Sequence, residues 1–394
     1  MAVTMRRMRR VRGGPGRAEH RPRGRRAVVV AAAAVALLAA SMASIAATPG
    51  NQGAEAKWAD WLRSHDGAAL VNPIERWYYA MQAPDAGGHP HSLATVPRPR
   101  ALPPGTVPPP TIRRPSLPAP VPLVVPPALP GEGQWRPTGP VVDGRPTMEV
   151  AQYRADTVYT SQLTSAVWID PSVLRVRLVP GSQEPGGAWP VAPDLAGATA
   201  ARAVAAFNGG FRFQDAHGGF YLDGRTAVPL RTGAASVVIS RDGSIGIGSW
   251  GSEVTMTSRV EAVLQNLVLL VDHGRLTPAA AGGDPALWGA TLGASPVVAR
   301  SGIGVTASGA LLYVAGPALT ARSLADALQR AGAVRAMTLD MNPEWVTCNF
   351  FTHPDRAHPA SVVATKLYPQ MQRPATRYLG PTPESRDFFS VSTR

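Results

Sequence analysis

Three polar clusters flanked by glycine contain the residue types that could do chemistry in this chain. The first is NGGF at 208–211, inside the stretch AFNGGFRFQDAHGGFYLDGR at 206–225, which also holds an Asp and a His. The second is RSGIG at 300–304, and the third is LDMNPEW at 339–345. An Arg fork and the open N–H groups of glycines can bind an anion, while a carboxylate can move a proton or stabilise a developing cation. Each cluster ends an apolar run, so we expect all three to meet at one rim of a sheet.

Each of these residues also has an ordinary structural interpretation. Asn208 followed by Gly209 is a frequent type I′ turn. Asp215 could cap or turn a loop, His217 could be a solvated loop residue, and Arg300 could form a surface ion pair of little energetic weight. Asp340 could simply close a turn after a strand. The residue types alone therefore leave both a binding site and a set of turns open.

The common catalytic and cofactor motifs are missing from the sequence. It contains no G-x-S-x-G nucleophile elbow. G-x-G-x-x-G occurs at 246–251, but it follows an expected hairpin strand and no helix pattern comes after it, which argues against a dinucleotide site. His353 and His358 are five residues apart, which is poor spacing for metal ligands. We therefore expect neither a cofactor nor a metal ion.

Several segments, taken in order, resemble the phosphodiester glycosidase family. They are AFNGGF, QNLVLLVDHGRL, RSGIGVTASGALLYVAG and SLADALQRAGAVRAMTLD, and the resemblance covers residues 200–345. The whole body is also similar to a membrane-anchored actinobacterial branch of that family. The resemblance implies hydrolysis of a sugar phosphodiester outside the cytoplasm.

The resemblance also implies roles for the matching residues. Asn208, with the backbone of 209–210, matches the family's NGGF segment, and Arg300 matches the Arg of its R-[ST]-x-x-G segment. Asp340 matches the Asp of its LDGGGS segment. Phosphate is already a good leaving group, so one carboxylate near the anomeric carbon could stabilise an oxocarbenium-like state or position a water molecule.

The chain departs from the family where LDGGGS is replaced by LDMNPEW at 339–345. Without the three glycines the backbone cannot approach a ligand in the same way. Asn342 tolerates a left-handed turn, and Asn342 and Glu344 could replace the lost groups. We therefore expect catalytic carboxyls at Asp340 and Glu344. The expected substrate-binding residues are Asn208, Gly209, Gly210, Arg300, Asp215, His217 and Asn342. The alternative is a pocket that binds an envelope polymer without catalysis.

The N-terminal residues predict an export segment. Residues 1–26 form a basic leader, expected to be disordered, in which ten Arg and one Glu account for +9 of the formal net charge of +13. Residues 27–47 carry no charge and are long enough to span a membrane as a helix, with a cleaved signal as the alternative. Positive charge holds such a leader in the cytoplasm, so both alternatives place the body outside. Because the basicity is confined to the leader, nucleic-acid binding is not expected.

Two further segments separate the leader from the body. Residues 51–83 contain two short amphipathic helix patterns, around Trp58 and Trp77. Residues 84–132 are dominated by proline, which favours extended polyproline II backbone. We expect residues 84–132 to be a disordered linker that could span a cell wall.

The body, residues 133–394, has the pattern of an α+β domain with a mixed, largely antiparallel sheet and a few helices. Short strands separated by turns are expected within 166–181, 235–248 and 301–316, and Asp-Gly at 242–243 predicts a hairpin. Helices are expected at 200–207 and 321–333. The single cysteine, Cys348, is expected to be a buried and inert thiol.

Together these features predict a membrane-tethered, extracytoplasmic phosphodiester glycosidase-like hydrolase. Its expected partner is a sugar phosphodiester or a cell-wall glycan, and the N-terminal helix is expected to contact the membrane. A binding module without catalysis and a structural tether are the alternatives.

Overall fold

The computed structural model describes residues 23–48, scattered residues between 50 and 65, and most of 84–394. Within the last range, residues 104, 106, 285–286, 289–296, 356–357, 359–360 and 381 are not described. The chain forms two compact units, Met1–Thr48 and Pro49–Arg394. The basic leader up to residue 22 and most of the amphipathic helices predicted at 51–83 lie outside the described residues.

The first unit contains one helix, α1, within the residues that the structure describes. It spans Arg23–Ala47, a length of 25 residues, and includes the apolar run at 27–47. No helix in the described part of the chain is both long enough and apolar enough to cross a membrane. The membrane anchor at 27–47 therefore stays a prediction.

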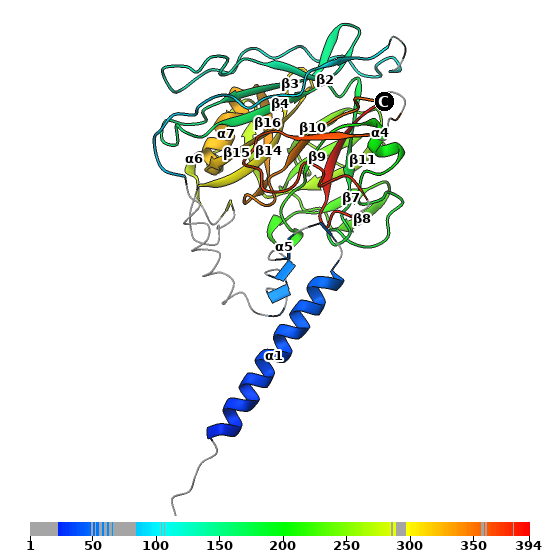
Figure 1. The fold of residues 1–394 in the computed structure, drawn as a ribbon. Coiled ribbons are helices and arrows are strands. Elements are labelled where there is room, and N and C mark those ends of the chain that lie inside the picture. Colours follow the sequence, from blue (N-terminus) through cyan, green and yellow to red (C-terminus); the bar gives the residue numbers. More distant parts are fainter. Residues whose placement is uncertain are drawn as a thin grey trace, which may run out of the picture. The chain divides into compact units, whose positions relative to one another are not determined.

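The second unit is built around a nine-stranded sheet with the order β1-β2-β3-β4-β15-β14-β16-β12-β13 (Figure 1). Its pairs are antiparallel except for the parallel pair β1–β2. The strands are β1 (Arg100–Ala101), β2 (Arg136–Val142), β3 (Arg145–Tyr153), β4 (Thr164–Ile169), β12 (Leu269–Asp272), β13 (Arg275–Leu276), β14 (Val298–Thr306), β15 (Leu311–Leu319) and β16 (Ala333–Met341).

Two five-stranded antiparallel sheets complete the unit. The β6 sheet has the order β18-β17-β6-β19-β5, and the β9 sheet has the order β10-β9-β11-β7-β8. The β6 sheet contains β5 (Leu174–Val179), β6 (Ala203–Asn208), β17 (Cys348–Thr352), β18 (Val363–Lys366) and β19 (Phe388–Thr393). The β9 sheet contains β7 (Phe220–Leu222), β8 (Arg225–Val228), β9 (Ala235–Ser240), β10 (Ile245–Ser249) and β11 (Val260–Gln265).

The largest hydrophobic core lies where the three sheets meet. Ile303 and Met337 of the nine-stranded sheet, Phe207 and Phe389 of the β6 sheet, and Leu264 of the β9 sheet belong to it. Period-two alternation explains this arrangement, since most residues on the inward-facing side of these strands are apolar. The structure confirms an α+β fold with largely antiparallel sheets, and it places the buried Cys348 in this core.

Four short helices lie within the described part of residues 84–394: α4 (Ala198–Arg202), α5 (Phe213–Ala216), α6 (Pro278–Gly282) and α7 (Ala321–Arg330). Helix α7 begins with a capping box between Thr320 and Ser323. Its buried Leu324 and Leu328, four residues apart on one face, pack in the second core cluster with strand residues such as Val314. The helix predicted at 321–333 is therefore confirmed, apart from its last residues.

The helix predicted at 200–207 is wrong over most of its length. Only Ala198–Arg202 is helical, and Ala203–Asn208 is strand β6. Alanine favours helices, but β6 lies in the middle of its sheet and pairs with β17 on one side and β19 on the other. The hydrogen bonds and burial of a central strand outweigh the local preference.

The Pro-rich segment at 84–132 packs along the body, in contrast to the free linker expected from its sequence. Strand β1 pairs with β2, and Val121 and Val125 are buried. Buried Arg154 donates to the carbonyls of Val125 and Pro127 and forms an ion pair with Glu132 at 2.7 Å. Proline cannot complete a sheet by itself, but its carbonyls remain free to accept hydrogen bonds from the body.

Candidate active site

Three strand ends meet at the candidate site. Strand β6 ends at Asn208, strand β16 ends at Met341, and β19 begins at Phe388. Because Phe388 pairs with Asn208, the residue before Phe388 lies beside the residue after Asn208. Asp387 and Gly209 are brought together in this way, and the ion pair between Arg386 and Asp340 joins the end of β16 to them.

Asn208 holds the strand ends together through its side chain. Its Oδ1 accepts hydrogen bonds from the Tyr313 hydroxyl at 2.9 Å and from the Thr347 N–H at 3.1 Å. Its Nδ2 donates to the carbonyl of Gly209 and to the Ser301 hydroxyl. The amide is buried and fully used by these contacts, so Asn208 positions the site rather than presenting a free amide to a ligand.

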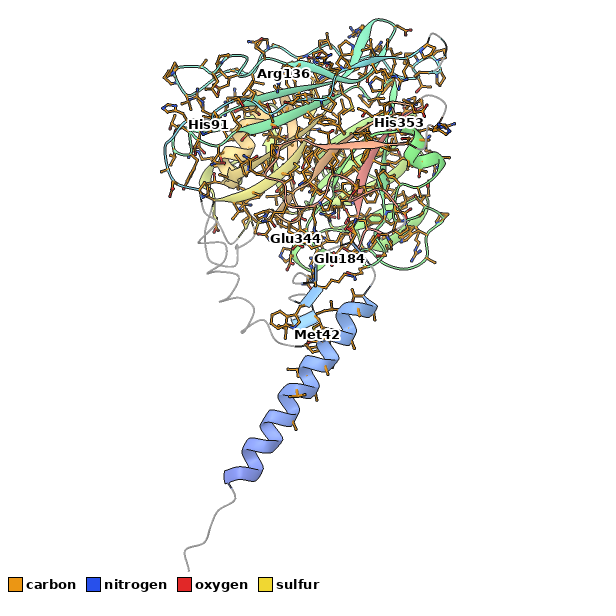
Figure 2. The ribbon with its side chains drawn as sticks, in the orientation of Figure 1. Met42, His91, Arg136, Glu184, Glu344 and His353 are labelled. Atoms are coloured by element: carbon orange, nitrogen blue, oxygen red, sulfur yellow. The ribbon has the colours of Figure 1, made fainter. Side chains whose placement is uncertain are left out.

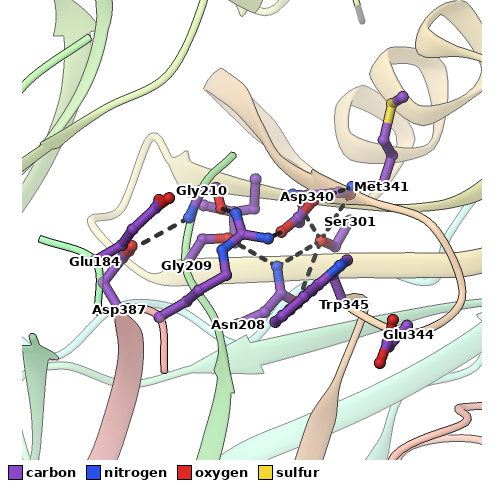
Figure 3. A network of polar contacts seen from close by, with 12 residues as sticks. Glu184, Asn208, Gly209, Gly210, Ser301, Asp340, Met341, Glu344, Trp345 and Asp387 are labelled. Atoms are coloured by element: carbon purple, nitrogen blue, oxygen red, sulfur yellow. Dashed lines mark hydrogen bonds and ion pairs between the residues drawn. The ribbon is translucent and has the colours of Figure 1, made fainter. Parts of the chain in front are cut away.

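Ser301 connects this network to Asp340. The Ser301 Oγ accepts a hydrogen bond from the Asp340 N–H at 3.1 Å and donates to the Asp340 carbonyl at 3.2 Å. Figure 3 shows Asn208, Ser301 and Asp340 joined in one chain of hydrogen bonds. The sequence clusters at 208–211, 300–304 and 339–345 therefore do meet in the fold.

Two carboxyl groups and one guanidinium form the centre of the site. The Oδ2 of Asp340 forms an ion pair with Nη1 of Arg386 at 3.0 Å, and its Oδ1 accepts the Met341 N–H at 2.7 Å. Arg386 also donates to the carbonyl of Gly210. Asp387 follows in sequence, and its Oδ2 accepts the Gly210 N–H at 3.4 Å. The other oxygen, Oδ1, is buried and has no hydrogen-bond partner in the described part of the chain.

Burial keeps protons on both carboxyl groups to unusually high pH. It raises the pKa of Asp340 to about 6, against the lowering effect of Arg386. It raises the pKa of Asp387 to about 7, again opposed by Arg386 and reinforced by the negative charges of Glu184 and Asp340. Two acidic groups whose pKa values lie near neutrality can hold and release protons at physiological pH.

The glycines of the first cluster are explained by the close approach of Asp387. A Cβ at Gly209 would lie 1.9 Å from the Asp387 Oδ2, so no other residue fits there without displacing the carboxyl group. A Cβ at Gly210 would lie 3.6 Å from Asn266, which is an ordinary contact. Neither glycine has a positive φ, so 208–209 is not the type I′ turn considered as the ordinary alternative.

The aromatic ring of Trp345 covers the guanidinium of Arg386, whose carbon lies 4.5 Å from the ring centre. Arg377 and Arg373 approach the same ring at 5.2 Å and 5.7 Å. Asp340, Asp387 and Arg386 are all buried. Trp345 therefore packs against the cation that pairs with Asp340.

Glu344 does not join Asp340, although the sequence suggested these two as the catalytic carboxyls. It forms an ion pair with Arg373, and Figure 3 shows it apart from the network around Asp340. Asn342 does adopt the left-handed turn expected of it, with φ 82°, and its N–H donates to the carbonyl of Ala299. Its side-chain Oδ1 is buried without a hydrogen-bond partner among the described residues.

Arg300 points to the opposite face of β14 from Ser301, as alternation along a strand requires. Its guanidinium donates to the carbonyls of Leu319 and Trp288 and contacts the sulfur of Met341. Burial lowers its pKa to about 10. Its hydrogen bonds all lie on that side of the sheet, so it supports the end of β16 from behind and does not contact Asp340.

Asp215 and His217 lie on the surface around helix α5. Asp215 belongs to the first turn of α5, and His217 ends it in a left-handed conformation with φ 47°. Both side chains are exposed. The structure therefore places them in the ordinary loop role that the sequence left open, and they contact neither Asp340 nor Asp387.

The sequence analysis missed Arg386, Asp387 and Glu184. The sequence did contain a sign of the first two, because the charged pair Arg386–Asp387 directly precedes the largely apolar run FFSV. A polar group borders an apolar run in the same way in each of the other three clusters. Glu184 lies in a loop, and its side chain accepts a hydrogen bond from the Phe213 N–H at 3.3 Å. The spacing of residues in the sequence does not predict this contact. Within the described residues, no group of three His, Cys, Asp or Glu side chains could hold a metal ion.

Comparison with protein families identifies the central part of the chain. Residues 201–340 match the model of the phosphodiester glycosidase family. The match confirms the resemblance seen in the sequence and includes Asn208, Arg300 and Asp340. Arg386 and Asp387 lie beyond the matched segment.

Three solved structures are similar to this chain at low identity. The catalytic domain of zebrafish N-acetylglucosamine-1-phosphodiester α-N-acetylglucosaminidase, auto-inhibited by its pro-peptide, has 14% identity and a TM-score of 0.41 over 64% of this chain and 85% of that chain. A hypothetical protein from Synechocystis has 14% identity and a TM-score of 0.36 over 64% of this chain and 63% of that chain. A Burkholderia pseudomallei protein described as exported has 12% identity and a TM-score of 0.28 over 60% of this chain and 75% of that chain. No curated protein matches the sequence.

Proposed function

Because residues 201–340 carry a phosphodiester glycosidase domain, we propose that this protein hydrolyses the glycosidic bond of a sugar phosphodiester. The observation that supports this proposal most is the buried group of Asp340, Arg386 and Asp387 at the meeting point of three strand ends. It combines a carboxylate, a proton donor and a cation, which are the groups that cleavage beside a phosphate requires.

Each group has a distinct role in the proposed reaction. Asp340, paired with Arg386, supplies the carboxylate that stabilises positive charge at the anomeric carbon or takes a proton from the attacking water. Asp387 holds a proton near neutral pH and delivers it to the departing phosphate oxygen. Phosphate leaves readily, so this proton transfer has to supply only modest help.

Access to these groups requires movement of the segment Asn342–Trp345. In the structure Trp345 covers Arg386, and both carboxyl groups are buried. Burial of the reacting groups excludes water and strengthens their electrostatic interactions once a substrate is bound. We propose that the substrate displaces Trp345 as it enters.

The rate of this reaction is expected to pass through a maximum between about pH 6 and pH 7, given the pKa values near 6 for Asp340 and near 7 for Asp387. Activity rises with pH as Asp340 loses its proton, and it falls as Asp387 loses the proton it must donate. The measurement is kcat/KM from pH 4.5 to 9 for release of reducing sugar from a panel of sugar-1-phosphodiesters. A rate that keeps rising above pH 8 would contradict the assignment of Asp387 as the acid.

A binding module without catalysis is the second candidate. Two observations favour it, namely the burial of both carboxyl groups and the replacement of three glycines by Met341, Asn342 and Pro343. Such a module would bind an envelope polymer and release no sugar. The same panel of substrates separates the two candidates.

The location of the protein is part of the proposal. The basic leader and the uncharged run at 27–47 support an extracytoplasmic body that is tethered to the cell membrane, or secreted after signal cleavage. A substrate in the cell envelope would suit either location.

A further inference from the structure

Three cavities adjoin one another beside the β6 sheet, two of them over its outer face and the third between its end and strands β1 and β2. Their volumes are about 680, 450 and 370 Å³. The first and second share Leu195 in their walls, and the second and third share Arg202 and Thr393. They are therefore neighbours, and we call the three together the outer row.

Arginines dominate the charge of the outer row. Two aspartates, Asp194 and Asp355, also line it. The arginines that line its second and third cavities are Arg98, Arg100, Arg175, Arg177, Arg202 and Arg394. Arg98, Arg177 and Arg202 are exposed and form no ion pair within the part of the chain that the structure describes. Exposed cations without a carboxylate partner are available to an anionic ligand.

The strand register explains why arginines on β5 lie beside a stretch of small side chains on β19 and β6. Arg175 and Arg177 are two residues apart on edge strand β5, so they share a face. Directly across on β19 lie Ser392 and Ser390, and across from these on β6 lie small alanines. Small side chains in the centre and arginines at the edge leave room for a chain to lie along the sheet.

The outer row begins beside the candidate active site. Arg377 lines its first cavity, and the same guanidinium donates to the carbonyl of Glu344 at 3.1 Å and lies 5.2 Å from the Trp345 ring centre. The third cavity is lined by His353. Figure 2 shows Glu344, whose carbonyl accepts from Arg377, and His353 at well-separated places on the body, so the first and third cavities of the row lie apart.

We propose that the outer row binds an extended glycan whose repeats are joined by phosphodiesters, so that the substrate of the active site is a polymer. This inference rests on the proposed function, because it names the substrate class of the same site. Each phosphodiester carries one negative charge, and the exposed Arg98, Arg177 and Arg202 would each meet one such charge as the chain passes.

The lining of the row argues against other polymers. Neutral glycans and single-stranded nucleic acids are commonly held by stacking on aromatic rings. Among the described residues that line the three cavities, the aromatic rings are those of Phe351, which is buried, and His353. A ligand would therefore be bound at this surface mainly through charged contacts with arginines and not through stacking on aromatic rings.

The test compares the full-length protein with a double variant, Arg177→Gln with Arg202→Gln. The matched control is Arg259→Gln with Arg275→Gln, which removes the same charge from exposed residues outside the row. The probes are an end-labelled poly(glycosyl phosphate), its single repeat as a methyl phosphodiester, and dextran of similar length. Binding is followed by fluorescence polarisation at low and high salt, and hydrolysis by released reducing sugar.

The proposal predicts that the double variant binds the charged polymer at least about tenfold more weakly and with less salt dependence, since charge-assisted contacts are lost. Turnover of the single repeat stays at the wild-type rate, and the control retains both properties. Unchanged polymer binding by the double variant, or equally tight binding of dextran by the wild type, would overturn the proposal. If the polymer binds as predicted but no substrate releases sugar, the outer row stands and the hydrolase proposal fails.

Discussion

Replacing Asp340 with Asn is expected to lower kcat for a sugar-1-phosphodiester by about 10²- to 10⁴-fold, the usual contribution of a positioned acid–base or charge-stabilising group. Asparagine keeps the shape of the side chain, and its oxygen can still accept the Met341 N–H. The negative charge that pairs with Arg386 is lost, and no other group in the site replaces it. The measurement is initial-rate release of reducing sugar, with circular dichroism to confirm the fold.

The matched control for this variant is Glu344→Gln, which is also a change from carboxylate to amide. Glu344 forms its ion pair with Arg373, away from the network around Asp340, so most of the activity should remain. If Glu344→Gln abolished turnover while Asp340→Asn preserved it, the catalytic carboxyl would be Glu344 and not Asp340. The buried group of Asp340, Arg386 and Asp387 would then not be the reaction centre.

Replacing Arg386 with Met is expected to destabilise the protein by about 3–5 kcal/mol at pH 8, the usual cost of leaving a buried charge without its partner. Asp340 and Asp387 are ionised at that pH and would lose the nearest cation. At pH 5 both carboxyl groups hold protons, so the loss in free energy of unfolding should be clearly smaller. The measurement is urea unfolding at the two pH values.

Arg335→Met provides the control for the Arg386 variant. Arg335 pairs with Asp272 at a partly exposed position, where an ion pair contributes about 0–1 kcal/mol. A loss of stability in the Arg386 variant that is equal at pH 5 and pH 8 would show that packing against Trp345, and not charge, is what Arg386 contributes.

Much of the fold follows from local patterns in the sequence. Asp-Gly at 242–243 marks the β9–β10 hairpin, and the strands expected within 166–181 and 301–316 are present. Helix α7 follows from its apolar spacing and its capping residues. The failure at 200–207 arose because alanine-rich segments do not reveal whether two strands will pair on either side of them.

The candidate site was only half visible in the sequence. Asn208 and Asp340 could be placed through the order of segments in the resembled family. Arg386 and Asp387 could not, because they reach the site through the pairing of β19 with β6, which joins residues far apart in the chain. The Arg300 side chain points to one face of β14, and the sequence motif that contains Arg300 does not show which face that is.

The most direct test of the central claim is hydrolysis of a sugar-1-phosphodiester by the full-length protein in ¹⁸O-labelled water, followed by rapid reduction and mass spectrometry. If Asp340 and Asp387 cleave the glycosidic bond, the label will appear in the released sugar and not in the phosphate, and Asp340→Asn will release almost none. Label in the phosphate would show that the phosphorus–oxygen bond is cut instead. That result, or no release from any substrate, would contradict a phosphodiester glycosidase centred on Asp340.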